Sequence, residues 1–300
     1  MPVIRPFSRS DREQLTALVN AHVAAVIPGV IVSVNALLNQ LEREPDETIV
    51  DPWVIERRTL VAVERDAIVG GTHLLRYGDD DRVSDSYRNV AEIRWLVCRP
   101  DAGAKLMAES LRVLRDWQPS RIAADGSLPA FGVYGVPATW PHIRSLYVDA
   151  GFVQQGTTEI LSWVDPDRLP AAQPVVGLQL ERSVGVNGTR FSAVGESGPV
   201  GMIEVETNAG GMLFAQPSLW ADIGNLRVDE AHRRRGVASW LLAEAAAWLR
   251  RGGATHLLAY AWPEETDELG FYAACGFEEL VRTERGWLLG PGPGLSSRLL

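Results

Sequence analysis

LRVDEAHRRRGVASWLL, residues 226–242, joins three sequence patterns in one short segment. It starts as an apolar strand, continues as a basic segment with a glycine, and ends with apolar residues at helical spacing. We therefore expect a strand, a loop and a helix. The first N–H groups of a helix have no partner inside the helix and lie at the positive end of its dipole. The segment thus predicts an anion site.

The residue types at this junction suit a pyrophosphate. Gly236 lets the backbone approach a ligand where a Cβ would interfere, and Ala238 keeps the next turn small. Positive charge comes from Arg233, Arg234 and Arg235. Three arginines alone are more often a solvated charged surface, but their place between a strand and a helix favours phosphate binding.

A second motif, FYAACGF, follows at residues 271–277. The spacing Arg233-x-x-Gly236-x-Ala238 resembles the R/Q-x-x-G-x-G/A signature of the GNAT superfamily, the acyl-CoA-dependent N-acyltransferases. FYAACGF resembles the later L/F-Y-x-x-x-G-F motif of the same superfamily. The resemblance implies an α/β fold with a mixed sheet, and acetyl-CoA as co-substrate.

The resemblance also implies roles for individual residues. Backbone groups of the strand would bind the acyl carbonyl and pantetheine, and amides of the following loop and helix would bind the pyrophosphate. The residues implied to bind acetyl-CoA are Leu226, Arg227, Val228, Arg233, Arg234, Arg235, Gly236, Val237, Ala238 and Ser239.

Two catalytic residues are implied by the same resemblance. Tyr272 occupies the position of a general acid, and Asp222 falls where several members carry a strand glutamate as general base. An aspartate of ordinary pKa, near 3.9, is too weak to deprotonate an amine directly unless burial raises its pKa, so a water relay is the expected route. One departure is Glu265, where an asparagine often contacts pantetheine.

Three pairs of similar segments indicate an internal duplication. LYVDAGF (146–152) matches FYAACGF at an offset of 125 residues, and AEIRWLVC (91–98) matches ADIGNLRV (221–228) at an offset of 130. LMAESLRVL (106–114) matches LLAEAAAWL (241–249) at an offset of 135. The order is the same in both halves, which predicts two tandem GNAT-like domains. This architecture is similar to that of mycothiol synthase.

The repeats predict four segments along the chain. A diverged domain covers 1–163, a linker with three prolines covers 164–174, a domain with the acyl-CoA site covers 175–290, and a flexible tail covers 291–300.

The two copies are expected to differ in their acyl-CoA sites. The loop after residue 98 is five residues shorter in the first copy, and it carries the anionic Asp101. Gly103 alone cannot restore the site, so this copy is expected to be degenerate.

The halves should also differ at their beginnings. The first half predicts two early helices, over about 12–26 and over 34–41, whereas the second passes from strand to strand after residue 175. In the superfamily that this sequence resembles, these helices usually form one wall of the acceptor site. We expect the first half or a second subunit to close that wall.

Composition bounds the remaining possibilities. The chain has 300 residues, 46% hydrophobic and 22% charged, with a net charge of −9 and a sequence pI near 5.2. This disfavours nucleic-acid and anionic-membrane partners and permits a cationic one. Two distant cysteines, Cys98 and Cys275, and the absence of a signal-peptide pattern at the start favour the cytoplasm. The five histidines show no ligand spacing, so no metal is expected.

The sequence thus favours an N-acetyltransferase that moves an acetyl group to a primary amine by direct attack, catalysed in the second domain. The amine would belong to a small molecule or a peptide, and the protein would be a monomer or a homodimer. Two alternatives stay open: a non-catalytic acyl-CoA sensor, and a nucleotide-binding enzyme of another fold, which no phosphate-binding motif supports. Two interpretations of Glu204 and Glu206 stay open: solvent-facing strand residues, or contacts for a cationic acceptor. Glu92 is the residue of the first copy that corresponds to Asp222.

Overall fold

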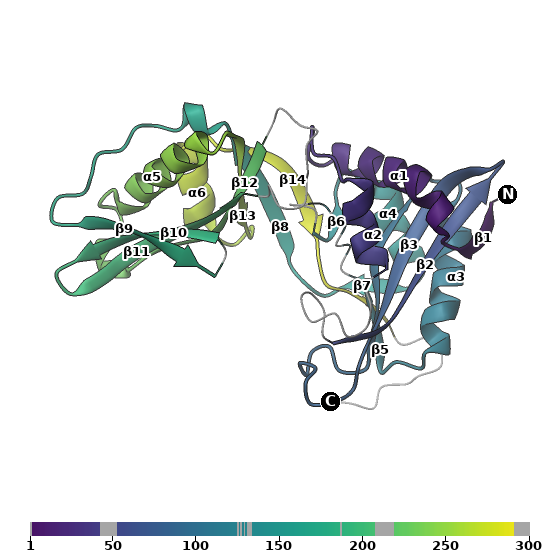
Figure 1. The fold of residues 1–300 in the computed structure, drawn as a ribbon. Helices are drawn as coiled ribbons and strands as arrows, with labels where there is room; N and C mark the ends of the chain where they lie inside the picture. Colours follow the sequence, from purple (N-terminus) through teal and green to yellow (C-terminus); the bar gives the residue numbers. More distant parts are fainter. Residues whose placement is uncertain are drawn as a thin grey trace. The chain divides into compact units, whose positions relative to one another are not determined.

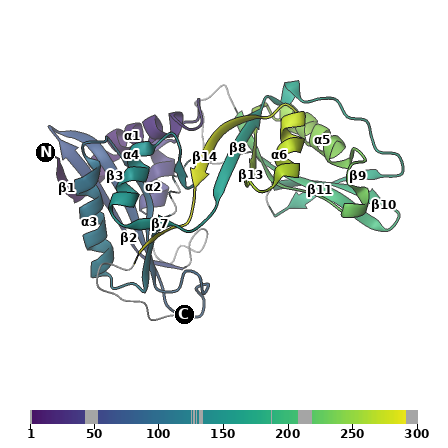
Figure 2. The same ribbon diagram turned by 180° about the vertical axis from the view of Figure 1, so that it is seen from behind.

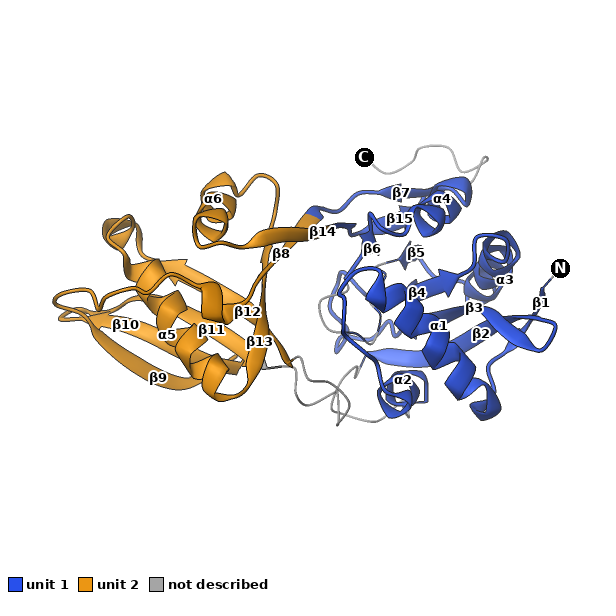
Figure 3. Ribbon diagram, turned by 90° about the horizontal axis from the view of Figure 1, so that it is seen from above, with its two compact units in different colours: residues 1–158, 282–300 blue, residues 159–281 orange. Residues whose placement is uncertain are grey.

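The computed structural model describes residues 2–42, 53–124, 126, 128, 130, 134–186, 188–207 and 219–290. The chain divides into two compact units (Figure 3). Unit 1 consists of Met1–Thr158 and Arg282–Leu300, and unit 2 is Glu159–Val281. The predicted tail at 291–300 lies outside the described residues. Within the described part of the chain, no helix is long and apolar enough to cross a membrane.

Unit 1 is a seven-stranded mixed sheet with helices on both faces. The strand order is β1-β2-β3-β4-β5-β15-β7. These strands are β1 (Val3–Pro6), β2 (Val54–Glu64), β3 (Ala67–Tyr77), β4 (Val90–Cys98), β5 (Arg121–Ala124), β15 (Trp287–Leu289) and β7 (Phe152–Gln154). The helices are α1 (Arg12–Ala24), α2 (Val34–Leu41), α3 (Gly103–Asp116) and α4 (Pro141–Asp149), with a 3-10 turn η1 (Arg9–Asp11) and a short strand β6 (Val136–Pro137).

Two adjacent glycines on β3 show which helices cover which face of this sheet. A Cβ at Gly70 would lie 3.1 Å from Leu106 of α3, and a Cβ at Gly71 would lie 2.5 Å from Leu15 of α1. Because successive residues of a strand point to opposite faces, α1 and α3 lie on opposite faces. Figure 1 shows both helices along β2 and β3.

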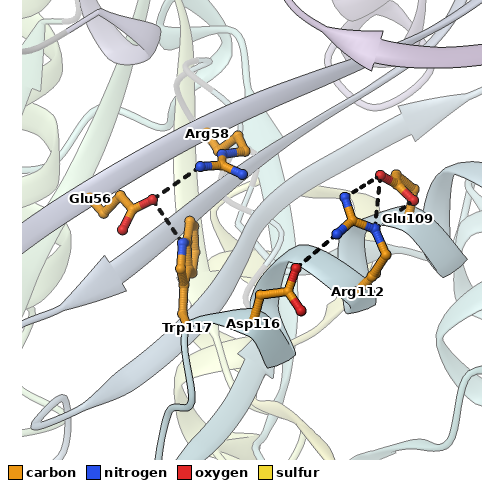
Figure 4. Close-up of polar contacts among 6 residues, drawn as sticks. All are labelled: Glu56, Arg58, Glu109, Arg112, Asp116 and Trp117. Atoms are coloured by element: carbon orange, nitrogen blue, oxygen red, sulfur yellow. Dashed lines mark hydrogen bonds and ion pairs between the residues drawn. The ribbon is translucent and has the colours of Figure 1, made fainter.

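Helix α3 is tied to the sheet at its carboxyl end. Trp117 Nε1 donates to Glu56 Oε1 on β2 at 2.8 Å (Figure 4). On the exposed side of the same helix, Arg112 contacts Glu109 at 2.7 Å and Asp116 at 2.8 Å. Such exposed pairs contribute little, so the apolar face fixes the position of α3.

Unit 2 contains one helix packed along its sheet and a second helix near the carboxyl end. The strand order is β14-β8-β13-β12-β11-β10-β9. The strands are β8 (Thr158–Val164), β9 (Gln179–Gly185), β10 (Gly188–Gly195), β11 (Gly198–Thr207), β12 (Leu219–Val228), β13 (Ala254–Ala261) and β14 (Glu278–Glu284). The helices are α5 (Val237–Arg251) and α6 (Thr266–Ala274), with 3-10 turns η2 (Pro166–Arg168) and η4 (Glu230–His232).

The core of unit 2 lies between α5 and the middle strands (Figure 2). Leu241 and Leu249 of α5 are fully buried, as are Ile203 and Val205 of β11. Between β8 and β9 the chain forms only the turn η2, so no equivalent of α1 or α2 precedes β9. The sequence prediction that the second half has no such helices before its first strands therefore agrees with the described residues 165–178.

The duplication is visible in a shared irregularity. In unit 1 the β3–β4 register skips one residue, Arg94, between the pairs His73↔Trp95 and Leu74↔Ile93. In unit 2 the β11–β12 register skips Gly224 in the same way. Arg94 and Gly224 are separated by the same 130 residues as the sequence echoes around them. The shared register shift agrees with the predicted α/β fold built from two similar halves.

Each repeat contributes its last strand to the sheet that is built mainly from the other repeat. β8 ends the first repeat but lies between β13 and β14, and β15 ends the second repeat but lies between β5 and β7. The compact units therefore differ from the continuous domains 1–163 and 175–290 expected from sequence. Repeat similarity identifies two copies of a segment, but it does not indicate which sheet a terminal strand joins. Val164 and Pro166, at the start of the predicted linker, are buried in unit 2.

Candidate active site

Two neighbouring strands of unit 2 separate at Asp222. β12 pairs with β13 in parallel from Leu219↔Ala254 to Asp222↔Leu258. Beyond this pair β12 continues beside β11 as far as Val228, while β13 continues beside β8. In the described structure, the edge of β12 that follows Asp222 therefore has no strand partner on the β13 side. Its backbone groups are available to a ligand inserted between the strands.

Helix α5 starts beyond the end of β12 at a glycine in the left-handed conformation. Gly236 has φ +83° and caps the helix, and Arg234 before it has φ +59°. The first helical bond runs from the Trp240 N–H to the Gly236 carbonyl, which leaves the N–H groups of Val237, Ala238 and Ser239 outside the helical pattern.

The same glycine faces open space. A Cβ built on Gly236 would meet no atom within 4 Å. The conformation requires glycine, and the space in front of it is free for an anionic group. The residues at this helix start therefore fit a phosphate.

The three arginines line the exposed rim of this helix start. Arg233 Nε donates to the Val228 carbonyl oxygen at 3.2 Å, which ties the loop back to the strand end. Arg234 and Arg235 are exposed. On the strand itself, Arg227 lies 3.5 Å from Asp229. The structure thus brings the sequence-predicted phosphate and pantetheine residues together at one end of β12.

Asp222 sits where the strands part, and its surroundings alter its acidity. Burial, followed by the nearby charge of Glu206, raises the pKa of Asp222 to about 7. Tyr260 Oη donates to Asp222 Oδ2 at 3.4 Å, and Oδ1 is buried without a hydrogen-bond partner. A carboxylate with this pKa accepts a proton near neutral pH far more readily than an ordinary aspartate.

Tyr272 on α6 is 3% exposed and packs against Phe277, with ring centroids 5.0 Å apart. Its hydroxyl donates to Glu268 Oε1 at 3.1 Å. Burial, with the neighbouring Glu268 charge, raises the pKa of Tyr272, and burial raises the pKa of Glu268 as well. Tyr272 therefore stays protonated at neutral pH, and the raised pKa also makes its hydroxyl a weaker acid than that of an ordinary tyrosine.

Asp222 and Tyr272 lie toward opposite faces of the sheet. Ala221 and Ile223, on either side of Asp222, belong to the same apolar core as Tyr272. Adjacent strand residues point to opposite faces, so Asp222 points away from that core.

Glu265 stands at the start of α6, where its Oε2 accepts from the Trp262 N–H at 2.9 Å. The carboxylate thus closes a local turn.

The corresponding region of unit 1 is closed. The loop between β4 and α3 is residues 99–102, and Ala102 at its end is 1% exposed. A Cβ on Gly103 would lie 2.3 Å from Leu146 of α4, so this helix start packs against protein. His142 Nε2 donates to the Cys98 carbonyl oxygen at 3.0 Å. The exposed Asp101 adds negative charge at this end.

Several residues of the site did not emerge from sequence reasoning. Tyr260 contacts Asp222, and Glu268 accepts from Tyr272. Alternation of side chains along β13 could have identified Tyr260. It places Tyr260 and His256 on the same face as Leu258, the partner of Asp222. Over the described residues, no group of three His, Cys, Asp or Glu side chains could hold a metal ion.

The separated strands, Gly236 in the left-handed conformation and the N-terminus of α5 lie at one end of β12 in unit 2, and this arrangement fits an anionic ligand. Residues 158–277 match the family model described as "Acetyltransferase (GNAT) family". No curated protein matches the chain in sequence.

Two solved structures are similar over nearly the whole chain. One is the tandem GNAT protein from the clavulanic acid biosynthesis pathway, with a TM-score of 0.66 and 17% identity, covering 97% of this chain and 100% of that one. The other is a GCN5-related N-acetyltransferase from Sphaerobacter thermophilus, with a TM-score of 0.64 and 15% identity, covering 99% and 98%. The chain therefore has the tandem GNAT fold over nearly its whole length, and residues 158–277 match the GNAT acetyltransferase family model.

Proposed function

We propose that the protein transfers an acetyl group from acetyl-CoA to a primary amine, and that the second repeat, residues 175–290, catalyses the reaction. The observation that carries this proposal is Asp222, a largely buried carboxylate with one unpartnered oxygen at the point where β12 and β13 separate. The family match supports acyl transfer in general.

Acetyl-CoA supplies an activated thioester carbonyl. The N–H groups of Val237, Ala238 and Ser239 and the arginines beside them would bind its pyrophosphate. The free edge of β12 at Leu226 and Val228 would hold the pantetheine and the acyl carbonyl oxygen, whose developing charge backbone N–H groups stabilise.

The amine has to lose a proton before it can attack. With a pKa near 10, about one amine molecule in a thousand is neutral at pH 7, which costs about 4 kcal/mol. A carboxylate whose pKa is about 7 accepts this proton more readily than an ordinary aspartate by about three pKa units, so Asp222 serves as the general base and takes the proton directly. Tyr272 then protonates the thiolate that leaves.

The remaining assignments follow from the same proposal. The first repeat, residues 1–163, is the diverged copy with a degenerate acyl-CoA site, because its helix start is packed against Leu146. The acceptor is a small-molecule or peptide amine, the protein is cytoplasmic, and it acts as a monomer or a homodimer without a metal.

Calorimetric titration with acetyl-CoA, together with a thiol-release assay over a panel of amines, tests the proposal. We expect binding and amine-dependent thiol release. Binding without release for any amine would favour the non-catalytic sensor. Binding of a nucleotide in place of CoA would indicate the third alternative.

A further inference from the structure

Two glutamates on one face of β11 have different surroundings. Glu204 is 1% exposed, and its Oε1 accepts from Arg190 Nε at 2.7 Å. Glu206, one pleat further along, is exposed and lies directly opposite Asp222 in the strand register. Like charges directly opposite each other destabilise a sheet. Within the described residues neither Glu206 nor Asp222 has an ion pair with a basic side chain.

Aromatic side chains border this acidic pair on its other side. Tyr260 on β13 contacts Asp222, and His256 on the same strand stacks on Trp220 with ring centroids 4.3 Å apart. Trp163 of β8 also stacks on His256, with ring centroids 5.1 Å apart, and lies 6.1 Å from Trp220. Trp220 is 2% exposed, and its Nε1 has no hydrogen-bond partner. An unpaired acidic pair beside an aromatic surface is the chemistry that recognises an organic cation.

We propose that the acceptor binds as its ammonium ion between Glu206 and Asp222, against the aromatic side chains of β13, and that Glu206 determines this specificity. The inference rests on the proposed function and adds the charge state and the class of the acceptor: an amine attached to an apolar or aromatic body. Glu206 contacts the cation and takes no part in the proton transfers.

The acidic pair and the ammonium ion carry opposite charges. The Glu206 carboxylate raises the pKa of Asp222, so an ammonium ion between the two lowers that pKa again. The other groups near Asp222 are Glu204 on β11, whose charge Arg190 offsets, and Tyr260 and His256 on β13. Acceptor binding therefore keeps Asp222 in the ionised form that can accept a proton, although it makes this carboxylate a weaker base than in the free protein.

The steps balance in atoms and charge. Asp222 takes one proton from the ammonium ion, and the neutral nitrogen forms a bond to the carbonyl carbon as the C–S bond breaks. The second proton leaves the nitrogen to water. Tyr272 gives its proton to the thiolate and regains one from water, and Asp222 releases its proton to water, so the products are the amide, the free thiol and one proton in solution.

The test compares two charge-neutralising variants with two probe amines. Benzylamine is an ammonium ion at pH 8, whereas aniline is neutral, and both carry the same ring. At pH 8 Asp222 is ionised, since its pKa is about 7. For Glu206→Gln we expect the KM for benzylamine to rise roughly fivefold, the upper range of a partly exposed ion pair, with the KM for aniline unchanged. Glu196→Gln removes the same charge at the exposed β10–β11 turn and should change neither KM.

The possible outcomes separate this inference from the proposed function. If no amine on a broader panel is acetylated, the proposed function fails and the inference fails with it. If amines are acetylated but Glu206→Gln leaves the benzylamine KM within the range of Glu196→Gln, the inference alone is wrong. An equal rise for aniline and benzylamine would also overturn it, because it would show a role unrelated to the charge of the acceptor.

Discussion

The two strand-to-helix junctions, β4–α3 in unit 1 and β12–α5 in unit 2, descend from the same sequence pattern and differ in length and in openness. The first has four residues, 99–102, and its helix start packs against Leu146. The second has eight residues, 229–236, which is four more than the first where the sequence offsets predicted five, and it ends at Gly236, which faces open space. The strands, the bulge and the helix are alike in both. The difference indicates that the proposed anion site depends on the loop, on a frame that both copies share.

A second difference lies on the strands themselves, at Glu92 and Asp222. Both carboxylate oxygens of Glu92 have partners: Tyr77 Oη donates to Oε2 at 2.5 Å, and the Arg94 guanidinium lies 3.5 Å from Oε1. Asp222 has one long bond from Tyr260 and one unpartnered oxygen. A satisfied buried carboxylate stabilises the fold, whereas an unsatisfied one is available for chemistry at a cost in stability.

The largest effect on turnover is expected at Tyr272, and its counterpart in the first repeat, Tyr147, provides the control. Tyr272→Phe keeps the ring and removes the proton donor, so we expect turnover to fall roughly 10²- to 10⁴-fold with little change in CoA affinity. Tyr147→Phe makes the same change at a fully buried position of unit 1 and should leave turnover intact. Steady-state kinetics of both variants decides the matter; full activity of Tyr272→Phe would make that tyrosine structural.

The next comparison concerns the two strand carboxylates. Asp222→Asn should lower the rate at pH 7 by roughly 10²-fold, because it removes the base. The loss should shrink toward pH 10, where the amine becomes neutral without help. The wild-type rate should fall below about pH 7 as Asp222 is protonated. Glu92→Gln should keep the wild-type pH–rate profile, and an unchanged profile for Asp222→Asn would place the base elsewhere.

A smaller effect is expected from a charge added at the two helix starts. Ala238 is the second residue of α5, and Ala104 is the second residue of α3. Ala238→Glu puts a like charge beside the pyrophosphate and should weaken CoA binding by about 10- to 100-fold, or about 1.4–2.8 kcal/mol. Ala104→Glu, at an exposed position, should leave the affinity unchanged. Equal losses in both variants would show that both helix starts bind CoA.

The smallest effect is on stability, and the two carboxylates should respond with opposite sign. The Asp222 pKa is about 7 in the folded protein and near 3.9 when unfolded, so its ionisation destabilises the fold progressively from about pH 4 to pH 7. Asp222→Asn should therefore stabilise the protein by about 1–2 kcal/mol at pH 8 and have little effect at pH 4. Glu92→Gln should destabilise it, because the Tyr77 and Arg94 contacts weaken. Urea denaturation at both pH values measures this; destabilisation by Asp222→Asn at pH 8 would contradict the account.

Much of the fold could be predicted from local pattern. The helix at 34–41 and the strand at 91–98 follow from apolar periodicity, and the anion site follows from the glycine between strand and helix. The exchange of β8 and β15 could not be predicted, because strand pairing depends on contacts distant in sequence.

The candidate site could be predicted only in part. Asp222 and Tyr272 came from motif positions, but the acidity of Asp222 depends on burial and on Glu206 across the sheet. Tyr260 belongs to no motif in the sequence, and the pairing of β12 with β13 brings it to Asp222. Register between strands is a tertiary property that spacing within a motif does not contain.

We propose that one of the two copies binds acyl-CoA. Calorimetric titration of the full chain with acetyl-CoA measures the number of sites per chain directly. We predict one site per chain, weakened in Ala238→Glu and retained in Ala104→Glu. Two equivalent sites per chain, or a single site weakened by Ala104→Glu and not by Ala238→Glu, would contradict it.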